Sequence, residues 1–216
     1  MATVLAVAIN GLGGFSFWLL VAGHFDADAV GSGQELFVAI TVAVSLTSMG
    51  LPIAVAHFCA DGSDQAEGTF RWSVVYSAAT SVVGAGLLVA LVPATTLAPL
   101  QSLGTPLTLA VLAALVAGMS LAVLVEVRLM ALRRWGWVLV RVGLVVGLRL
   151  PLLWWVSAPA SRWFVLLAAG APALSGLIGA AVLLRGSTPL LGAWRVPRDT
   201  LRAWFHFATV NYAGLV

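Results

Sequence analysis

The sequence contains no lysine, only one cysteine and few charged residues of any kind. Charged side chains make up 9% of the 216 residues, whereas hydrophobic residues make up 61%. A soluble domain carries about 25% charged residues, so this composition excludes one and predicts an integral membrane protein. The lone Cys59 excludes an internal disulfide and a multi-cysteine metal site. We therefore expect no metal site and no cofactor.

The lack of lysine means that all 11 basic residues are arginine. Together with the abundance of alanine, valine and leucine, this is typical of a GC-rich bacterial genome, and we expect a multi-pass protein of the bacterial plasma membrane. A formal net charge of +3 could indicate a nucleic-acid partner. However, the arginines lie in short segments between apolar runs, where membrane topology explains them better.

Long uncharged runs predict an all-α, polytopic membrane protein, because about 20 apolar residues in a helix cross the hydrocarbon core. Between Trp72 and Val125 there is no charged residue at all. Gly50-Leu51-Pro52 predicts a kink within the second run. The six predicted spans are Ala2–Ala22, Leu36–Ala60, Arg71–Val92, Pro106–Met130, Trp135–Ser157 and Trp163–Leu184.

The rest of the chain predicts a second, incomplete unit. Residues 1–184 form the expected six-helix lobe, and residues 185–202 form a basic linker. Residues 203–216 are apolar again, but they supply only about 20 Å of helix where about 30 Å is needed. We expect these residues to begin a seventh helix of a second lobe that is missing from this chain.

The distribution of arginine predicts the orientation of the chain in the membrane. If the N-terminus is cytoplasmic, the inner segments hold eight arginines and the outer segments hold only Arg162. Cytoplasmic loops are enriched in arginine, so we expect the N-terminus inside. The eight inner arginines are Arg71, Arg128, Arg133, Arg134, Arg185, Arg195, Arg198 and Arg202.

Arg149 is the most costly residue of the fifth span. It lies about 18 Å along the helix from Trp137, near the expected midplane, where a guanidinium costs at least about 2.5 kcal/mol. One interpretation is a cation that lines a cavity and binds an anionic group. The other is a structural arginine that caps the carbonyl of Gly147, which Pro151 leaves without its helical partner.

Two further polar residues are candidates for the same cavity. Arg141 lies at the depth of Glu126 on the preceding span, so a structural ion pair is favoured over a substrate contact. Asn10 in the first span either lines the cavity or bonds to a neighbouring helix. We predict Arg149, Arg141 and Asn10 as candidate substrate-binding residues.

Small residues and one histidine have simpler interpretations. Gly143 and Gly147 form a GxxxG pattern, and Gly176 and Ala180 form a similar pair; both predict helix-packing contacts. His57 is interpreted as a residue of the membrane interface rather than a proton relay, because no carboxylate stands beside it in the sequence.

Several short patterns occur along the chain: Gly14-Phe15-Ser16-Phe17, Asp28-Ala29-Val30-Gly31, Gly50-Leu51, His57-Phe58-Cys59-Ala60, Arg128-Leu129, Arg133-Arg134 and Asn211-Tyr212. Together they resemble the patterns of polysaccharide and lipid-linked oligosaccharide flippases of the multidrug/oligosaccharidyl-lipid/polysaccharide exporter superfamily. One departure is that the first two spans have no arginine, unlike those of lipid II flippases.

The resemblance implies a transporter that moves an anionic lipid-linked saccharide by alternating access between two lobes, in contact with membrane lipids. A drug or cation antiporter of the same superfamily is the first alternative, and it needs intramembrane carboxylates, for which only Glu126 is available. A membrane enzyme, or a subunit of polysaccharide synthesis without transport, is the second. The sequence offers no acid, base, nucleophile or metal cluster for catalysis, so we do not expect an enzyme.

Overall fold

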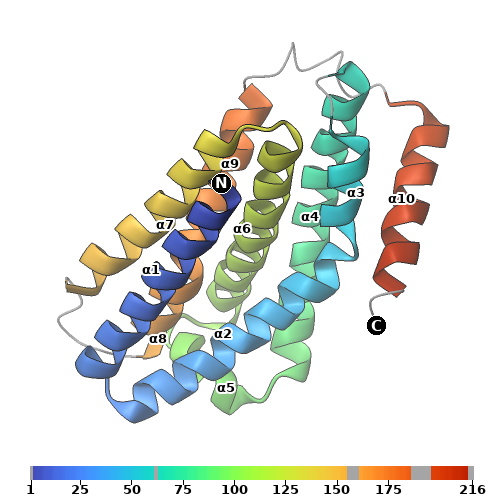
Figure 1. Cartoon of the computed structure of the whole chain (residues 1–216). Helices are drawn as coiled ribbons and strands as arrows, with labels where there is room; N and C mark the ends of the chain where they lie inside the picture. Colours follow the sequence, from blue (N-terminus) through green and yellow to red (C-terminus); the bar gives the residue numbers. More distant parts are fainter. Residues whose placement is uncertain (1, 61–62, 155–160, 186–195, 214–216) are drawn as a thin grey trace.

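The computed structural model describes residues 2–60, 63–154, 161–185 and 196–213, and all the regular elements in these ranges are helices (Figure 1). Six of the helical stretches are long and apolar enough to cross a membrane. This confirms an all-α chain with the expected number of spans, and it makes the protein a multi-pass membrane protein.

The first two spans meet in a tighter turn than the sequence predicts. Helix α1 (Ala2–His24) is followed by α2 (Ala27–Ser48), so the second span begins at Ala27 and not at Leu36. Asp28, which the predicted bounds leave between the first two spans, lies in the first turn of α2, where a carboxylate is favourable for the helix dipole.

The expected kink at Gly50 is a complete break between α2 and α3 (Leu51–Phe58). Met49 and Gly50 both adopt left-handed conformations, with φ of 37° and 75°. A Cβ atom at residue 50 would lie 2.2 Å from the backbone oxygen of Ala208, so only glycine fits this position. The break turns α3 away from the axis of α2.

Helix α4 (Asp64–Leu91) begins well before the predicted third span, because Ser63 caps it. The Ser63 hydroxyl accepts a hydrogen bond from the backbone N–H of Ala66 at 3.2 Å. Arg71, predicted as the first residue of the third span, therefore lies within the helix and is buried, with 1% of its surface exposed.

The fourth span is α6 (Thr105–Ala131), close to its predicted bounds, and it follows the short α5 (Ala94–Gln101). Its end is a Schellman turn. The N–H of Arg134 donates to the carbonyl of Leu129, and Arg133 takes a left-handed φ of 56°. This turn places Arg134 directly before the first residue of the next helix.

The fifth span is α7 (Trp135–Trp154), and the predicted end of this span at Ser157 lies outside the described residues. The sixth is continuous but irregular. It consists of α8 (Ser161–Val165), a π-helical turn η1 (Leu166–Gly170) and α9 (Ala171–Arg185). Nothing in the apolar pattern of this span indicated the π-helical turn.

Helix α10 (Arg198–Ala213) takes up the end of the predicted linker and the described part of the predicted seventh span. It is not among the helices long and apolar enough to cross a membrane. It packs beside α3 (Figure 1), where Phe207 stacks on His57 with ring centroids 4.8 Å apart. His57, which we interpreted as a residue of the membrane interface, thus contacts α10.

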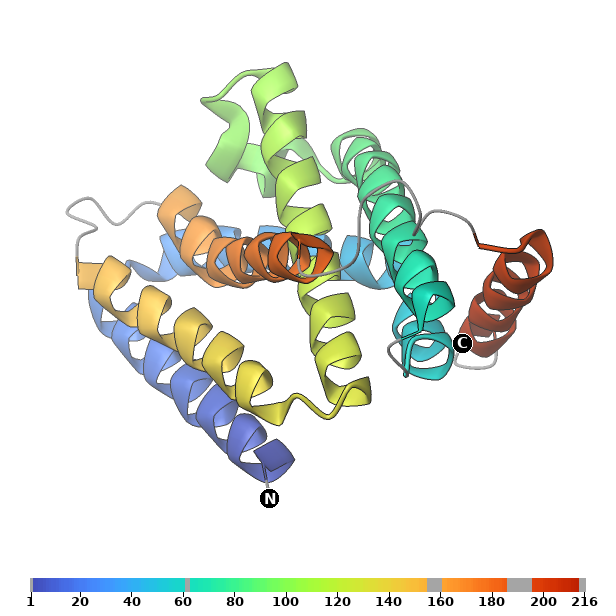
Figure 2. The same ribbon diagram turned by 90° about the horizontal axis from the view of Figure 1, so that it is seen from above.

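Helix α6 lies in the middle of the bundle, and α1 lies along α7 at one side of it (Figure 2). Helices approach each other closely at small residues in both parts of the bundle. A Cβ at Gly13 of α1 would lie 2.3 Å from the Val146 side chain of α7. A Cβ at Gly176 of α9 would lie 2.0 Å from the Gly118 oxygen of α6, so the predicted packing contact at Gly176 is confirmed.

The GxxxG pattern of α7 does not form the helix-packing contact that we predicted. Gly143 and Gly147 are both exposed, and a Cβ atom at either position would meet nothing within 4 Å in the described structure. The predicted packing contact is therefore wrong within these residues, because α1 packs on another face of α7, at Val146.

Candidate functional site

The three residues predicted as substrate-binding all line one pocket between α1, α6 and α7. The pocket has a volume of about 360 Å³, within the range of about 300–1,000 Å³ that is usual for small-molecule sites. We call it the arginine pocket. It is lined by Ala6, Asn10, Met119, Ala122, Val123, Glu126, Met130, Trp135, Val138, Arg141, Val142, Val145, Arg149 and Pro172.

Arg149 is held by the backbone of the sixth span. Its Nε donates to the carbonyl of Leu167 at 3.2 Å, and its Nη2 donates to the carbonyl of Ala168. On the described helix it lies about 21 Å along the axis from Trp135. The side chain thus joins α7 to η1.

Pro172 explains why these two carbonyls accept hydrogen bonds from a side chain. Proline has no N–H, so Pro172 cannot donate to Ala168, four residues earlier, as in an α-helix. Nor can it donate to Leu167, five residues earlier, as in a π-helix. Arg149 therefore caps carbonyls freed by a proline, as the structural interpretation predicts. However, the proline that frees them is Pro172 and not Pro151.

The charge of Arg149 has no acidic partner among the described residues, where no carboxylate lies within ion-pair distance. The guanidinium lies over the ring of Phe17 at 5.4 Å from the centroid, a cation–π contact. A guanidinium has five N–H donors, and two donor atoms are used on carbonyls. The Nη1 donors have no acceptor within hydrogen-bond distance among the described residues.

Arg141 forms the predicted ion pair with Glu126, from Nη2 to Oε2, which confirms that interpretation. Its Nη1 also lies 3.4 Å from the Ser175 hydroxyl of α9. Both members of the pair are partly buried, with 13% and 31% of the side chain exposed for Arg141 and Glu126. Arg141 is therefore neutralised, and of the two arginines in the pocket only Arg149 carries an uncompensated charge.

Asn10 lines the pocket from α1 and is exposed. Of the two interpretations, the structure places it at the cavity, where its amide offers both a donor and an acceptor. Because α1 lies along α7, residues far apart in the chain come together in one site.

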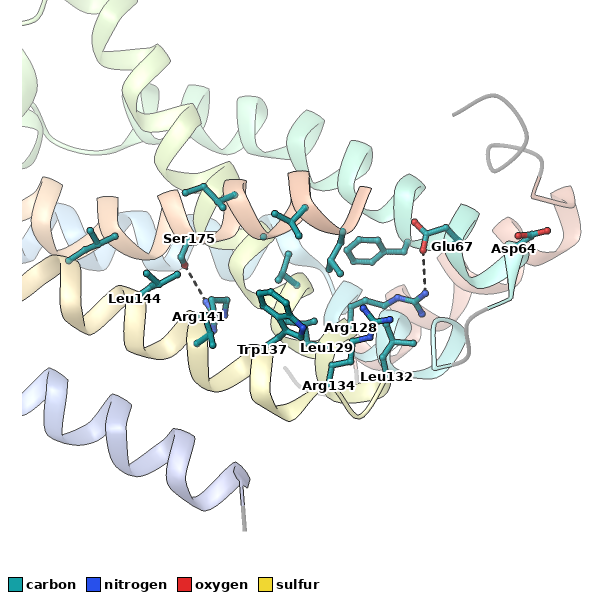
Figure 3. A pocket seen from close by; sticks show the side chains of 18 residues that line it. Asp64, Glu67, Arg128, Leu129, Leu132, Arg134, Trp137, Arg141, Leu144 and Ser175 are labelled. Atoms are coloured by element: carbon teal, nitrogen blue, oxygen red, sulfur yellow. Dashed lines mark hydrogen bonds and ion pairs between the residues drawn. The ribbon is translucent and has the colours of Figure 1, made fainter. Parts of the chain in front are cut away.

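A second charged cluster consists of Glu67, Arg71 and Arg128, and we did not predict it from the sequence. The carboxylate of Glu67 lies 3.6 Å from Nε of Arg71. It also lies 3.4 Å from Nη2 of Arg128 (Figure 3). Arg71 and Arg128 are almost fully buried, and such charges need a partner. The spacing of four residues between Glu67 and Arg71 was the available signal for the first contact.

Comparison of the chain with models of known protein families, with curated proteins and with solved structures finds no match.

Proposed function

We propose that the protein is a membrane transporter that moves an anionic, lipid-linked saccharide precursor across the bilayer by alternating access. The observation that carries the proposal is the unpaired charge of Arg149 in the arginine pocket. An anionic group is its electrostatic complement, and the planar guanidinium suits phosphate oxygens.

The sign of the pocket's charge favours this function over a cation antiporter. An antiporter needs a carboxylate that is free to exchange a proton or sodium ion for its substrate, and Glu126 is engaged by Arg141. With the charges of Glu126 and Arg141 balanced, the lining keeps the positive charge of Arg149. A cationic substrate would be repelled, whereas a phosphate or pyrophosphate would be attracted.

The test is transport by the purified protein in liposomes. The probe is undecaprenyl pyrophosphate linked to N-acetylglucosamine, and movement is followed by the accessibility of the sugar to an added lectin. We expect Arg149→Ala to lower the rate by about ten- to one hundredfold, because hydrogen bonds to charged groups contribute about 1.5–3 kcal/mol. Arg149→Lys keeps the charge but loses the planar fork, so the loss should be partial.

Arg185→Ala is the matched control, because Arg185 is an exposed arginine that does not line the pocket. Its transport rate should equal that of the wild type. If Arg149→Ala lowers the amount of folded protein but leaves transport per folded molecule unchanged, Arg149 is only structural. Failure of the wild-type protein to move the probe, while it moves a cationic drug, would favour the antiporter.

A further inference from the structure

A second pocket of about 530 Å³ lies between α4, α6, α7 and α9 (Figure 3). Most of its wall is apolar. Ile178 and Val182 of α9 line the part nearer the α6–α7 turn, because α9 runs antiparallel to α7, and Leu144 and Leu148 of α7 line the far end. Charged residues gather at the other end, near the turn between α6 and α7. The pocket therefore has a polar rim and an apolar interior, and we call it the α7–α9 groove.

The groove opens sideways, toward the surface that faces the membrane. Leu144, Ile178 and Val182 are 52%, 53% and 55% exposed although each lies within a predicted span. In a bilayer, exposed apolar side chains of a span face lipid. A ligand can thus enter the groove from the hydrocarbon layer without crossing water.

The rim of the groove carries a cation available to an anionic group. Arg134 is exposed and has no carboxylate within ion-pair distance among the described residues. Arg128 beside it is engaged by Glu67, and Asp64 lies farther along the rim, beyond Glu67 (Figure 3). Trp137 lines the same end, and tryptophan is typical of the level of lipid headgroups.

The length of the groove matches one leaflet of a bilayer. From Trp137 at the rim to Leu148 at the deepest point of α7 the helix rises about 17 Å, and half of a hydrocarbon core is about 15 Å thick. An acyl chain whose headgroup lies at Arg134 would therefore reach the end of the groove. A polyprenyl carrier chain is much longer than one leaflet is thick, so the groove fits it less well.

We propose that the α7–α9 groove binds one anionic phospholipid of the leaflet that surrounds the α6–α7 turn. The phosphate lies at Arg134. One acyl chain passes Val182 and Ile178 and ends against Leu148. This site is separate from the arginine pocket, although Arg141 lines both. The assignment does not depend on which substrate the protein transports.

The test is native mass spectrometry of the full chain, incubated with equal amounts of phosphatidylglycerol and phosphatidylcholine that carry identical acyl chains. We expect preferential retention of phosphatidylglycerol. Arg134→Gln should lower the ratio of phosphatidylglycerol to phosphatidylcholine about fivefold, the effect of one basic residue near an anionic lipid surface. Arg133→Gln is the matched control, because Arg133 is an adjacent exposed arginine that does not line the groove, and its ratio should stay unchanged.

A second pair of variants tests the apolar part of the site. Ile178→Trp fills the groove and should reduce retention of both lipids. Leu174→Trp, one turn earlier on an exposed position outside the groove, should not. Equal effects of Arg133→Gln and Arg134→Gln would overturn the site, as would equal retention of the two lipids by the wild type. Preferential retention of undecaprenyl phosphate over phosphatidylglycerol would overturn the choice of ligand.

Discussion

At the scale of single residues, two arginines of the same helix have opposite electrostatic roles. Arg141 is neutralised by Glu126, whereas Arg149 is held by uncharged backbone carbonyls and keeps its charge. A carbonyl fixes the position of a guanidinium without cancelling its charge, so Arg149 can be both well positioned and attractive to an anion. The structural and functional interpretations of Arg149 are therefore compatible.

We predict that Arg149 and Pro172 are energetically coupled. Arg149→Ala should lower the free energy of unfolding by about 1–3 kcal/mol, because two carbonyls lose their donor. In a Pro172→Ala background the new N–H can satisfy a carbonyl, so the same replacement should cost less, with a coupling energy of at least about 0.5 kcal/mol. The measurement is a double-mutant cycle of denaturant unfolding in detergent.

The control cycle combines Arg149→Ala with Pro151→Ala. Pro151 deprives the carbonyl of Gly147 of its helical donor, but the hydrogen bonds of Arg149 go to Leu167 and Ala168. This cycle should be additive. Coupling to Pro151 and none to Pro172 would mean that the arginine caps its own helix instead.

At the scale of helices, two similar glycine patterns have different surroundings. Gly176 of α9 lies against the backbone of α6, whereas Gly143 and Gly147 of α7 have open space where a side chain would be. The difference depends on which face of each helix meets a neighbour. A small-residue pattern indicates that close packing is possible, and the neighbouring helices decide whether it occurs.

We predict that Gly176→Ala destabilises the protein and that Gly147→Ala does not. The added methyl at residue 176 would lie 2.0 Å from the Gly118 oxygen and 2.4 Å from the Ala122 nitrogen, both backbone atoms that cannot move independently. Forced packing of this kind costs about 1–3 kcal/mol or more. At residue 147 nothing lies within 4 Å, and alanine should be neutral or stabilising by up to about 1 kcal/mol.

Apparent melting temperatures of the two variants in detergent, with recovery of monodisperse protein, provide the measurement. Equal melting temperatures would contradict the close approach of α6 and α9. A clear loss at residue 147 would instead indicate a packing contact of α7 outside the described residues.

At the scale of the whole molecule, the bundle has two ends of different character. The α6–α7 turn lies at the same end as the start of α4, whereas the α5–α6 turn lies at the other (Figure 1). The first end contains Arg128, Arg133 and Arg134 together with Asp64 and Glu67, and the second contains the exposed Asp28 and Glu35 with a single arginine among its described residues, Arg162. This asymmetry motivates the prediction of orientation.

We predict that the α6–α7 turn is cytoplasmic. In a Cys59→Ala background, a cysteine at Ser102 should react with a membrane-impermeant thiol reagent in intact cells, and a cysteine at Arg133 should react only after permeabilisation. Both positions are exposed and lie at opposite ends of the bundle. Labelling of Arg133→Cys from outside would contradict the positive-inside assignment.

The sequence by itself determined the number of spans, an irregularity at Gly50 and the pairing of Glu126 with Arg141. These features depend on local quantities. The length of an uncharged run decides whether it crosses a membrane, and the rise per residue in two helices joined by a short turn decides which charges lie at the same depth. Ser63 and Asp28 also explain the helix starts that we placed too late.

Only the tertiary structure decided which spans are neighbours. Three contacts join segments that are distant in the sequence. Helix α1 packs on α7, Glu67 forms an ion pair with Arg128, and Arg149 donates hydrogen bonds to the carbonyls freed by Pro172. The physical reason lies in the bilayer. Surfaces that face lipid and surfaces that face another helix are both apolar, so the hydrophobic pattern does not reveal which face of a span is buried.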